Sequence, residues 1–219
     1  MDDASSHDTS PAERRRLRVR ASILDAAEKV FAAEGSEGLS IRRLADEIDY
    51  SPAAIYKYFG SKEELVDELK EAFFAEILTH VDSARLSTGP YMERAKSCLR
   101  VYMETALNKP QHYMAAFSDV QGMVEIDEWE EVDHSQSNKH NAFAFLVSMV
   151  AEGQERGELR QDVSDVALAM SLWSALHGAA TLIAHIPGFP ETKPIESGLS
   201  RDAFLDLHTD ILLRGAQPQ

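Results

Sequence analysis

The stretch that decides the fold is LSIRRLADEIDYSPAAIYKYFGSKEEL, residues 39–65. Ser40 is a favourable N-cap residue, and the apolar residues after it recur at the spacing of one helical face. These residues are Ile41, Leu44, Ala45 and Ile48. Ser51 and Pro52 then supply a second N-cap and a proline at the first helical position. The stretch therefore predicts two short helices, 40–48 and 52–59, joined by a tight turn.

The flanking segments complete a three-helix head. Upstream, residues 14–34 carry an apolar face, and Gly35 stands where a helix C-terminus is expected. That face consists of Ile23, Ala27, Val30 and Phe31. Downstream, Ser61 and Glu64 have the spacing of a capping box that opens a long fourth helix. We expect residues 14–62 to form one domain, residues 63–215 a second, and residues 1–13 a disordered tail.

Two short helices with this spacing have the dimensions of a helix-turn-helix, whose second helix enters the major groove of DNA. With Ile55 and Phe59 turned inward, the outward residues are small or can donate to phosphates: Ala53, Ala54, Tyr56, Lys57 and Tyr58. Arg42 is the strongest candidate to read a base, because a guanidinium can donate to both O6 and N7 of guanine. We expect Lys62, with the first free N–H groups of the fourth helix, to meet a phosphate.

Charge is segregated along the chain. The net charge of −15 argues, taken globally, against a nucleic-acid partner. Residues 11–62, however, carry ten Lys and Arg against eight Asp and Glu, whereas residues 63–219 have a net charge of −14. Five arginines fall within seven residues: Arg14, Arg15, Arg16, Arg18 and Arg20. They form a local basic arm at the start of the head.

Composition narrows the class of protein. Hydrophobic residues make up 44% of the chain, which argues against wholesale disorder. The one cysteine, Cys98, fits a reducing cytoplasm, and we expect it to be a small buried residue, with a redox role as the alternative. The N-terminal residues lack the pattern of a signal peptide, and no run reaches the roughly 18 apolar residues of a membrane span. These features predict a cytoplasmic protein without a membrane partner.

The rest of the chain also carries helical signals. Helices are predicted over 91–109, from 110 through Phe117, and over 137–157, 165–186 and 201–213, and residues 118–135 are assigned to a loop or short helical turns. Strand-like alternation does not persist anywhere. The predicted class is all-α, with about nine helices: a three-helix head and an antiparallel helical body.

The quoted stretch closely resembles the DNA-binding head of the TetR family of bacterial transcriptional regulators. The resemblance lies in the order and spacing of Leu44-Ala45, Ser51, Ile55-Tyr56, Tyr58-Phe59 and Lys62-Glu63-Glu64-Leu65. It implies that Arg42, Ala54 and Lys57 lie near bases and that Ser40, Ser51, Tyr56, Tyr58 and Lys62 contact the DNA backbone. It also implies a homodimeric repressor whose body binds a small molecule and changes the spacing of two heads. Asp49 departs from the glycine usual in the turn, so either the aspartate is left-handed or the turn adjusts.

Two expectations concern the body. The helix 165–186 is apolar on two faces, so one face is expected to meet a second copy of the chain. The predicted interface residues are Leu168, Leu172, Ala179, Ile183, Phe204, Leu207 and Ile211. Aromatic residues and methionines of the body are expected to supply both core and the lining of a pocket for an apolar or amphipathic effector. The pocket candidates are Tyr102, Met103, Tyr113, Met114, Phe117, Trp129, Phe143, Trp173 and His177.

Other functions find less support in the residues. Trp173, His177 and Gly178 match a Trp-x-x-x-His-Gly pattern of one TetR branch, and His177 is more simply explained as a structural histidine. The acidic stretch 125–133 fits a solvated face better than a cation site, so no metal, cofactor or catalytic residue is predicted. The alternatives are a helical protein-binding adaptor without DNA activity and a helical hydrolase. The residues do not decide between a repressor and an activator, and they name neither operator nor effector.

Overall fold

The computed structural model describes residues 10–118, 137–191 and 198–218, and every regular element among them is an α-helix. Contacts divide the chain into two compact units, Met1–Leu69 (unit 1) and Lys70–Gln219 (unit 2). The boundary falls inside one helix, α4 (Lys62–Arg85). The all-α class predicted from the sequence is confirmed, and the nine helices of the described ranges match the expected number.

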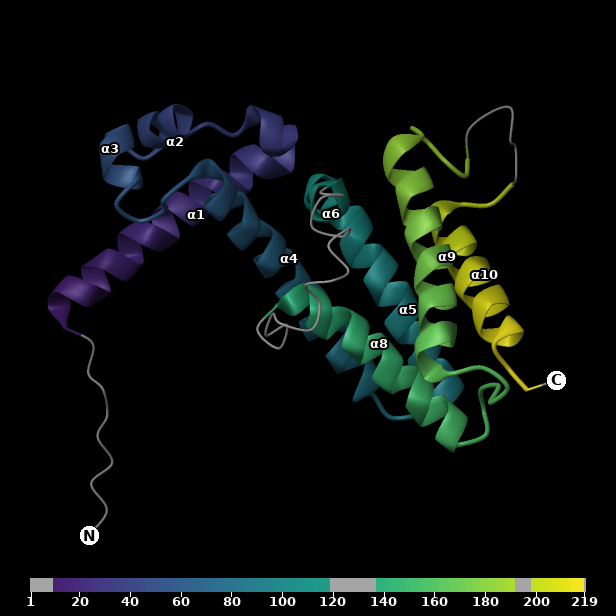
Figure 1. Ribbon diagram of the computed structural model, residues 1–219. Helices are drawn as coiled ribbons and strands as arrows, with labels where there is room; N and C mark the ends of the chain where they lie inside the picture. Colours follow the sequence, from purple (N-terminus) through teal and green to yellow (C-terminus); the bar gives the residue numbers. More distant parts are fainter. Residues whose placement is uncertain (1–9, 119–136, 192–197, 219) are drawn as a thin grey trace, which may run out of the picture. The chain divides into compact units, whose positions relative to one another are not determined.

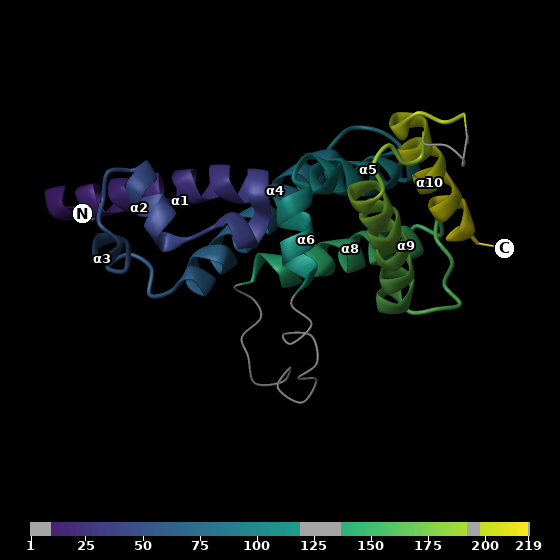
Figure 2. The ribbon, with the colours of Figure 1, turned by 90° about the horizontal axis from the view of Figure 1, so that it is seen from above.

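Unit 1 contains α1 (Pro11–Gly38), α2 (Ile41–Glu47), α3 (Pro52–Ile55) and the start of α4. Helix α2 packs against α1, and α3 packs against α2 (Figures 1 and 2). The residues that the sequence assigned to the core are buried: Ile23, Ala27, Val30, Phe31, Leu44, Ala45, Ile55 and Phe59. The apolar spacing of each short helix therefore produces one shared core.

Helix α1 begins and ends for identifiable reasons. Ser10 is its N-cap, and the Ser10 hydroxyl oxygen accepts from the Glu13 N–H at 3.2 Å. Pro11 occupies the first helical position, where no N–H is needed. Residues 11–13 are therefore helical rather than part of a tail, and the remainder of the predicted tail, 1–9, lies outside the described residues. At the other end, Gly35 has φ 68° and interrupts the helix at the position predicted for its cap.

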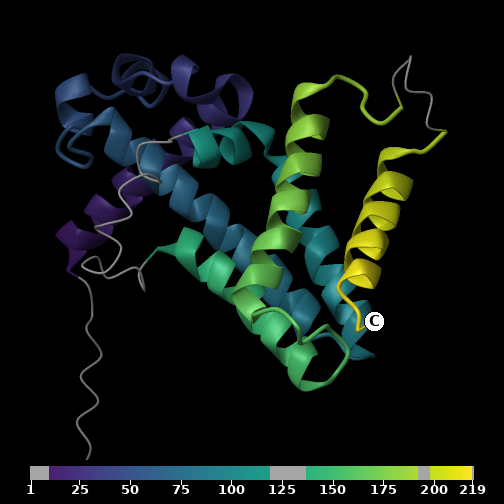
Figure 3. The same cartoon turned by 45° about the vertical axis from the view of Figure 1, so that its right-hand side comes forward.

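Unit 2 contains the rest of α4 together with five further described helices. These are α5 (Tyr91–Asn108), α6 (Pro110–Ser118), α8 (Asn138–Glu155), α9 (Asp165–His185) and α10 (Arg201–Gly215). Helix α9 lies beside α10, and α5 packs against both of them (Figures 1 and 3). Helix α8 packs on α9 as well. The segment 118–135, predicted as a loop, lies from residue 119 onward outside the described residues.

By length and composition, α9 could cross a membrane, with a mean hydropathy of 1.6 over its most apolar window. Its apolar character has another explanation in this fold. Three helices of unit 2 pack on it, and its buried residues join the main hydrophobic core of the unit. A helix covered on several sides reads as apolar around most of its circumference.

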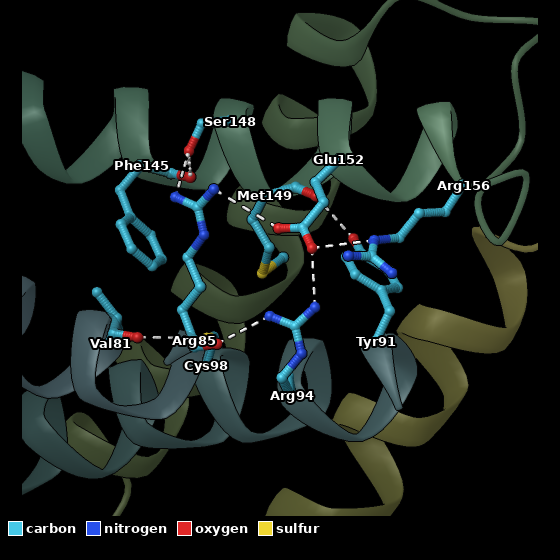
Figure 4. A network of polar contacts seen from close by, with 10 residues as sticks. All are labelled: Val81, Arg85, Tyr91, Arg94, Cys98, Phe145, Ser148, Met149, Glu152 and Arg156. Atoms are coloured by element: carbon cyan, nitrogen blue, oxygen red, sulfur yellow. Dashed lines mark hydrogen bonds and ion pairs between the residues drawn. The ribbon is translucent and has the colours of Figure 1, made fainter. Parts of the chain in front are cut away.

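A polar network joins the end of α4 to α5 and α8 (Figure 4). Glu152 accepts from Arg94 Nη2 at 2.8 Å and from Arg156 Nε at 3.0 Å, and it lies 3.5 Å from Arg85 Nη2. Arg94 also donates to the Arg85 carbonyl oxygen at 2.8 Å, which satisfies an end of α4. The hydrogen bond from Arg94 holds the pKa of Glu152 below its ordinary value. The network therefore keeps a carboxylate ionised among three arginines.

Candidate DNA interface and ligand cavity

The outward face of α3 is built as the helix-turn-helix spacing predicts. Ile55 and Phe59 are fully buried, whereas Ala53, Tyr56 and Lys57 are exposed. Ala54 and Tyr58 are half-buried at the edge of this face. The α-helix itself ends at Ile55, earlier than the predicted residue 59, and tight turns continue to Phe59. In these turns the Tyr58 and Phe59 N–H groups both donate to the Ile55 carbonyl oxygen, at 2.8 and 3.1 Å.

Ser40 and Ser51 have the same structural role in the two short helices. Each hydroxyl oxygen accepts from the backbone N–H three residues later, Arg43 for Ser40 and Ala54 for Ser51, at 3.2 Å in both cases. Both serines are exposed. Because the cap uses only the oxygen, each O–H remains available to donate to a phosphate. The capping role predicted from sequence is therefore compatible with the expected backbone contact.

Adjacent arginines in α2 have different environments. Arg43 donates from both terminal nitrogens to the Glu34 carboxylate, at 2.7 Å each, and this pair raises the pKa of Arg43 and lowers that of Glu34. Arg42 is exposed, and the described part of the chain places no carboxylate within ion-pair distance of it. Only Arg42 therefore has a guanidinium free to reach a base edge. The Arg43–Glu34 pair was not anticipated, since nothing local marks two charges nine residues apart.

The turn between α2 and α3 resolves the two possibilities left by Asp49. Its φ is 57°, so the aspartate itself is left-handed. The Tyr50 N–H donates to the Ala45 carbonyl oxygen at 2.8 Å, which closes the turn in this conformation. Aspartate adopts the left-handed region more readily than most residues, although at a free-energy cost that glycine avoids. The turn keeps its shape and carries the strain at one residue.

Lys62 lies at the start of α4 beside a modified capping box. The Ser61 hydroxyl oxygen accepts from the Glu64 N–H at 3.1 Å, as predicted. The returning carboxylate of Glu64 accepts from the Gly60 N–H at 2.6 Å, one residue before the N–H that a reciprocal pair would use. Hydrogen bonds from its own backbone and from Ser61 lower the pKa of Glu63. Lys62 therefore sits beside two acidic side chains, which limits its pull on a phosphate.

Unit 2 contains a cavity of about 430 Å³. Its wall is mostly aromatic and aliphatic and comes from α4, α5, α6, α8 and α9. Four predicted pocket residues line it: Tyr102, Phe117, Phe143 and Trp173. Met103 is fully buried in the core instead, and Tyr113, Met114 and His177 lie outside the wall. Trp129 is outside the described residues.

Tyr113 and His177 nevertheless support the cavity wall from behind. The Trp173 indole N–H donates to the Tyr102 hydroxyl at 3.3 Å, and Tyr102 is hydrogen-bonded to Tyr113. The Tyr113 hydroxyl lies 2.5 Å from His177 Nδ1. Burial lowers the pKa of His177, which favours the neutral ring that can accept from Tyr113. The Trp-x-x-x-His-Gly pattern thus fixes Tyr102 at the wall through two connected side chains.

Several lining residues had not been singled out. They are Phe74, Leu99, Lys139, His140, Ala142, Phe145, Leu146, Met149, Val166, Met170 and Leu176, together with Cys98. Lys139 brings a cation to the wall, with its Nζ 5.7 Å from the centre of the Phe117 ring. Burial raises the pKa of the Cys98 thiol to about 11, so Cys98 stays protonated and weakly reactive. The apolar residues of α8 were visible as a core pattern, but nothing in the sequence showed that they meet Phe74 of α4 around a cavity.

The predicted dimer residues divide into two groups. Leu168, Leu172, Ala179 and Ile183 are buried within unit 2 of a single chain, so they are not available to a partner. Leu207 and Ile211 are exposed, and Phe204 is half-buried against the core. The exposed apolar residues of α9 lie on its other face: Val166, Met170, Leu182 and Ile186. The face of α9 assigned to the partner is therefore corrected, because the intrachain core covers the one predicted.

Neither unit shows a metal site. Among the described residues, no group of three or more His, Cys, Asp or Glu side chains is placed to hold an ion. The acidic stretch 125–133 falls outside that part of the chain.

Comparison with known proteins identifies both parts of the chain. Residues 23–69 match a family model described as bacterial regulatory proteins of the tetR family, and residues 95–206 match one described as a tetracyclin repressor-like C-terminal domain. The probable HTH-type transcriptional regulator ArpR of Pseudomonas putida is 31% identical over 164 residues, covering 69% of this chain and 74% of that protein. The HTH-type transcriptional repressor AcnR of Corynebacterium glutamicum is 28% identical over 172 residues, covering 75% and 81%.

The fold is shared with solved structures. A protein of unknown function from Rhodococcus sp. RHA1 superposes with a TM-score of 0.71 at 22% identity, covering 99% of this chain and 100% of that one. The family consists of transcriptional regulators rather than enzymes, and TetR-family regulators bind operator DNA and dimerise. The chain therefore belongs to the TetR family and is a DNA-binding transcriptional regulator.

Proposed function

We propose that this chain is a homodimeric cytoplasmic repressor that leaves a palindromic operator when an apolar or amphipathic small molecule occupies the cavity of unit 2. The observation that carries this proposal is the cavity itself. Its volume of about 430 Å³ falls within the range of small-molecule sites. Its wall combines aromatic rings with a few polar groups, among them Tyr102 and Lys139, which is the usual composition of such a site.

The proposed release mechanism is a population shift. A ligand lowers operator affinity only in proportion to its preference for the conformation that binds DNA poorly. By linkage, the operator must weaken ligand binding by the same factor, typically about 5- to 150-fold. The proposal therefore requires a compound that binds the free protein more tightly than the operator complex.

The experiment is operator release in the presence of candidate compounds. The operator is first obtained by selecting bound duplexes from a random pool, and release is followed by fluorescence anisotropy of the labelled duplex. Ala142→Phe is the matched variant, because Ala142 lines the cavity and a phenyl group would fill part of it. We expect an apolar compound to release the wild type and to lose most of its effect on the variant, whose operator affinity is unchanged. A compound that releases both equally would place the effector site elsewhere.

For the dimer, we propose an interface along the exposed stripe of α9 and α10. On α9 the stripe follows every fourth residue: Val166, Met170, Ser174, Gly178, Leu182 and Ile186. On α10 it continues with Leu207 and Ile211. A Cβ atom added at Gly178 would meet nothing within 4 Å in its own chain, so no intrachain contact requires a glycine there. Glycine inside a helix costs about 0.5–1 kcal/mol relative to alanine, and a closely approaching partner helix explains its presence.

Gly178→Leu tests this interface by sedimentation. The added side chain fits within the single chain but would hold a partner helix away, so we expect the wild-type dimer to become a monomer that binds the operator much more weakly. Ala144→Leu adds an exposed leucine on α8 and should leave the dimer intact. A Gly178→Leu protein that remains fully dimeric would contradict the assigned face.

A further inference from the structure

The basic arm of α1 remains unassigned by the function proposed above. The arm was expected to begin after a disordered tail, yet its arginines lie on an ordered helix that starts at Pro11. Arg14, Arg15, Arg16 and Arg18 are exposed. Arg20 is different, because it pairs with Glu68 and its guanidinium lies 4.8 Å from the centre of the Phe59 ring. Arg20 therefore stabilises unit 1, whereas the earlier arginines are left facing solvent.

Two of these arginines line a groove. Arg15, Arg18, Val19 and Ser22 of α1 enclose, with Tyr50, a space of about 350 Å³ in unit 1. The four α1 residues follow the i, i+3, i+4, i+7 spacing of a single helical face. The lining thus offers two guanidinium groups and two hydroxyl groups, and it contains no carboxylate. Within the described residues neither arginine has an ion-pair partner, and the nearest acid along the chain to Tyr50 is Asp49.

The position of Tyr50 connects this groove to the DNA-facing helix. Tyr50 is 41% exposed and directly precedes Ser51, the N-cap of α3. A duplex that reaches the outward face of α3 therefore passes close to Tyr50. The groove is local to unit 1, while the chain as a whole has a net charge of −15, so general attraction for anions is weak. A ligand of the groove must combine negative charge with proximity to α3.

We propose that the groove formed by Arg15, Arg18, Ser22 and Tyr50 binds a phosphodiester of the operator backbone outside the base pairs that α3 faces. Guanidinium groups match phosphate oxygens in a bidentate geometry, and hydroxyl groups complete such contacts. The groove extends the footprint of each unit 1 along the duplex and fixes its register without reading bases. This inference rests on the proposed function, because it requires an operator.

The test is the salt dependence of operator binding by an Arg15→Gln/Arg18→Gln variant. Losing one phosphate contact flattens the slope of log K against log salt by about 1, so four arginines lost from a dimer should flatten it by about 4. Between about 50 and 200 mM salt, the wild-type affinity should then fall roughly 250-fold more than that of the variant. We expect the selected consensus sequence to be unchanged. Hydroxyl-radical footprinting should show loss of protection only at the outer edges of the site.

The matched control is Arg156→Gln/Arg214→Gln. It makes the same change in net charge at exposed positions of unit 2, and both arginines there form pairs one helical turn away. We expect its salt slope and footprint to equal those of the wild type. An equal effect of both double variants would overturn the proposal in favour of a general field effect, as would a groove variant with an unaltered slope or an unaltered footprint. A wild-type protein that selects no operator would instead refute the proposed function.

Discussion

Unit 1 and unit 2 differ in how their sequences encode what they do. In unit 1, the helix caps, the turn and the outward side chains all come from neighbouring residues of one stretch, 39–65. In unit 2, the cavity draws its wall from five helices between Phe74 and Leu176. The charge differs as well: residues 11–62 have a net charge of +2, and residues 63–219 one of −14. DNA recognition is thus written locally, whereas ligand recognition depends on packing between distant segments.

The largest expected effect tests whether each unit has its own core. Phe59 is fully buried in unit 1, so Phe59→Ala should destabilise that unit by about 3–5 kcal/mol and abolish operator binding. Both tryptophans, Trp129 and Trp173, belong to unit 2, so their fluorescence reports its unfolding in urea. We expect the tryptophan transition to stay where it is in the wild type.

The reciprocal variant is Leu172→Ala in the core of unit 2. It should shift the tryptophan transition by an amount equivalent to about 2–5 kcal/mol. If Phe59→Ala shifted the tryptophan transition as much as Leu172→Ala does, the two units would unfold as one, and the comparison drawn here would fail.

Arg42→Ala should separate specificity from general affinity within unit 1. Because Arg42 is the exposed arginine of α2, its loss should reduce the preference for the selected operator over altered sequences by about 1–3 kcal/mol. Lys62→Ala is the comparison, and it should weaken binding to all sequences alike. Competition binding with single-base variants of the operator measures both. An Arg42→Ala protein with unaltered preference would remove Arg42 from the base-reading set.

Glu152→Gln addresses the arginine network of unit 2. The carboxylate accepts from Arg94 and Arg156, so its loss should lower the free energy of unfolding of unit 2 by about 1–3 kcal/mol at neutral pH. Because the pKa of Glu152 is lowered in the folded state, its contribution is present above the ordinary pKa of glutamate and disappears as the pH falls through the folded value.

Urea unfolding of both proteins across that acidic range checks the sign. The difference between wild type and Glu152→Gln should shrink as the pH falls, and a difference that grows instead would contradict the assignment. Operator affinity should change little, since the network lies in unit 2.

Asp49→Gly should have the smallest effect, and it should be stabilising. Glycine removes the strain of φ 57°, but it also gains entropy in the unfolded chain, so the net gain should be less than about 1 kcal/mol. Asp49→Ala should destabilise unit 1, because alanine has neither advantage. Thermal unfolding followed by circular dichroism ranks the three proteins, and a glycine variant less stable than the wild type would show that the Asp49 side chain itself stabilises the turn.

The outcome of sequence reasoning follows the same division. Ser10, Gly35, Ser40, Ser51 and Ser61 act within a few residues of themselves, so helix ends in unit 1 were predictable to within a few residues. The periodicity of α9 showed that two faces are covered but not what covers them, because an intrachain core and a partner select the same residue types. Leu168 was therefore assigned to the partner, although the core of its own chain buries it.

The cavity shows the same limit at the level of single side chains. Tyr102 and Trp173 were predictable as aromatic residues of the body, and both line the wall. That His177 would stand behind Tyr113 rather than in the wall depends on the crossing of α6 and α9, which no local pattern encodes. Spacing identifies which residues belong to a core, while the position of a void within that core is a property of the assembled helices.

The most direct test of the account is selection of bound duplexes from a random DNA pool by the purified protein, followed by the stoichiometry of the complex with the enriched sequence. We predict a palindromic consensus bound by two chains, with half-site centres about one helical turn apart, roughly 34–36 Å. The contradicting result is no enrichment at low salt, both before and after refolding to remove any co-purified ligand.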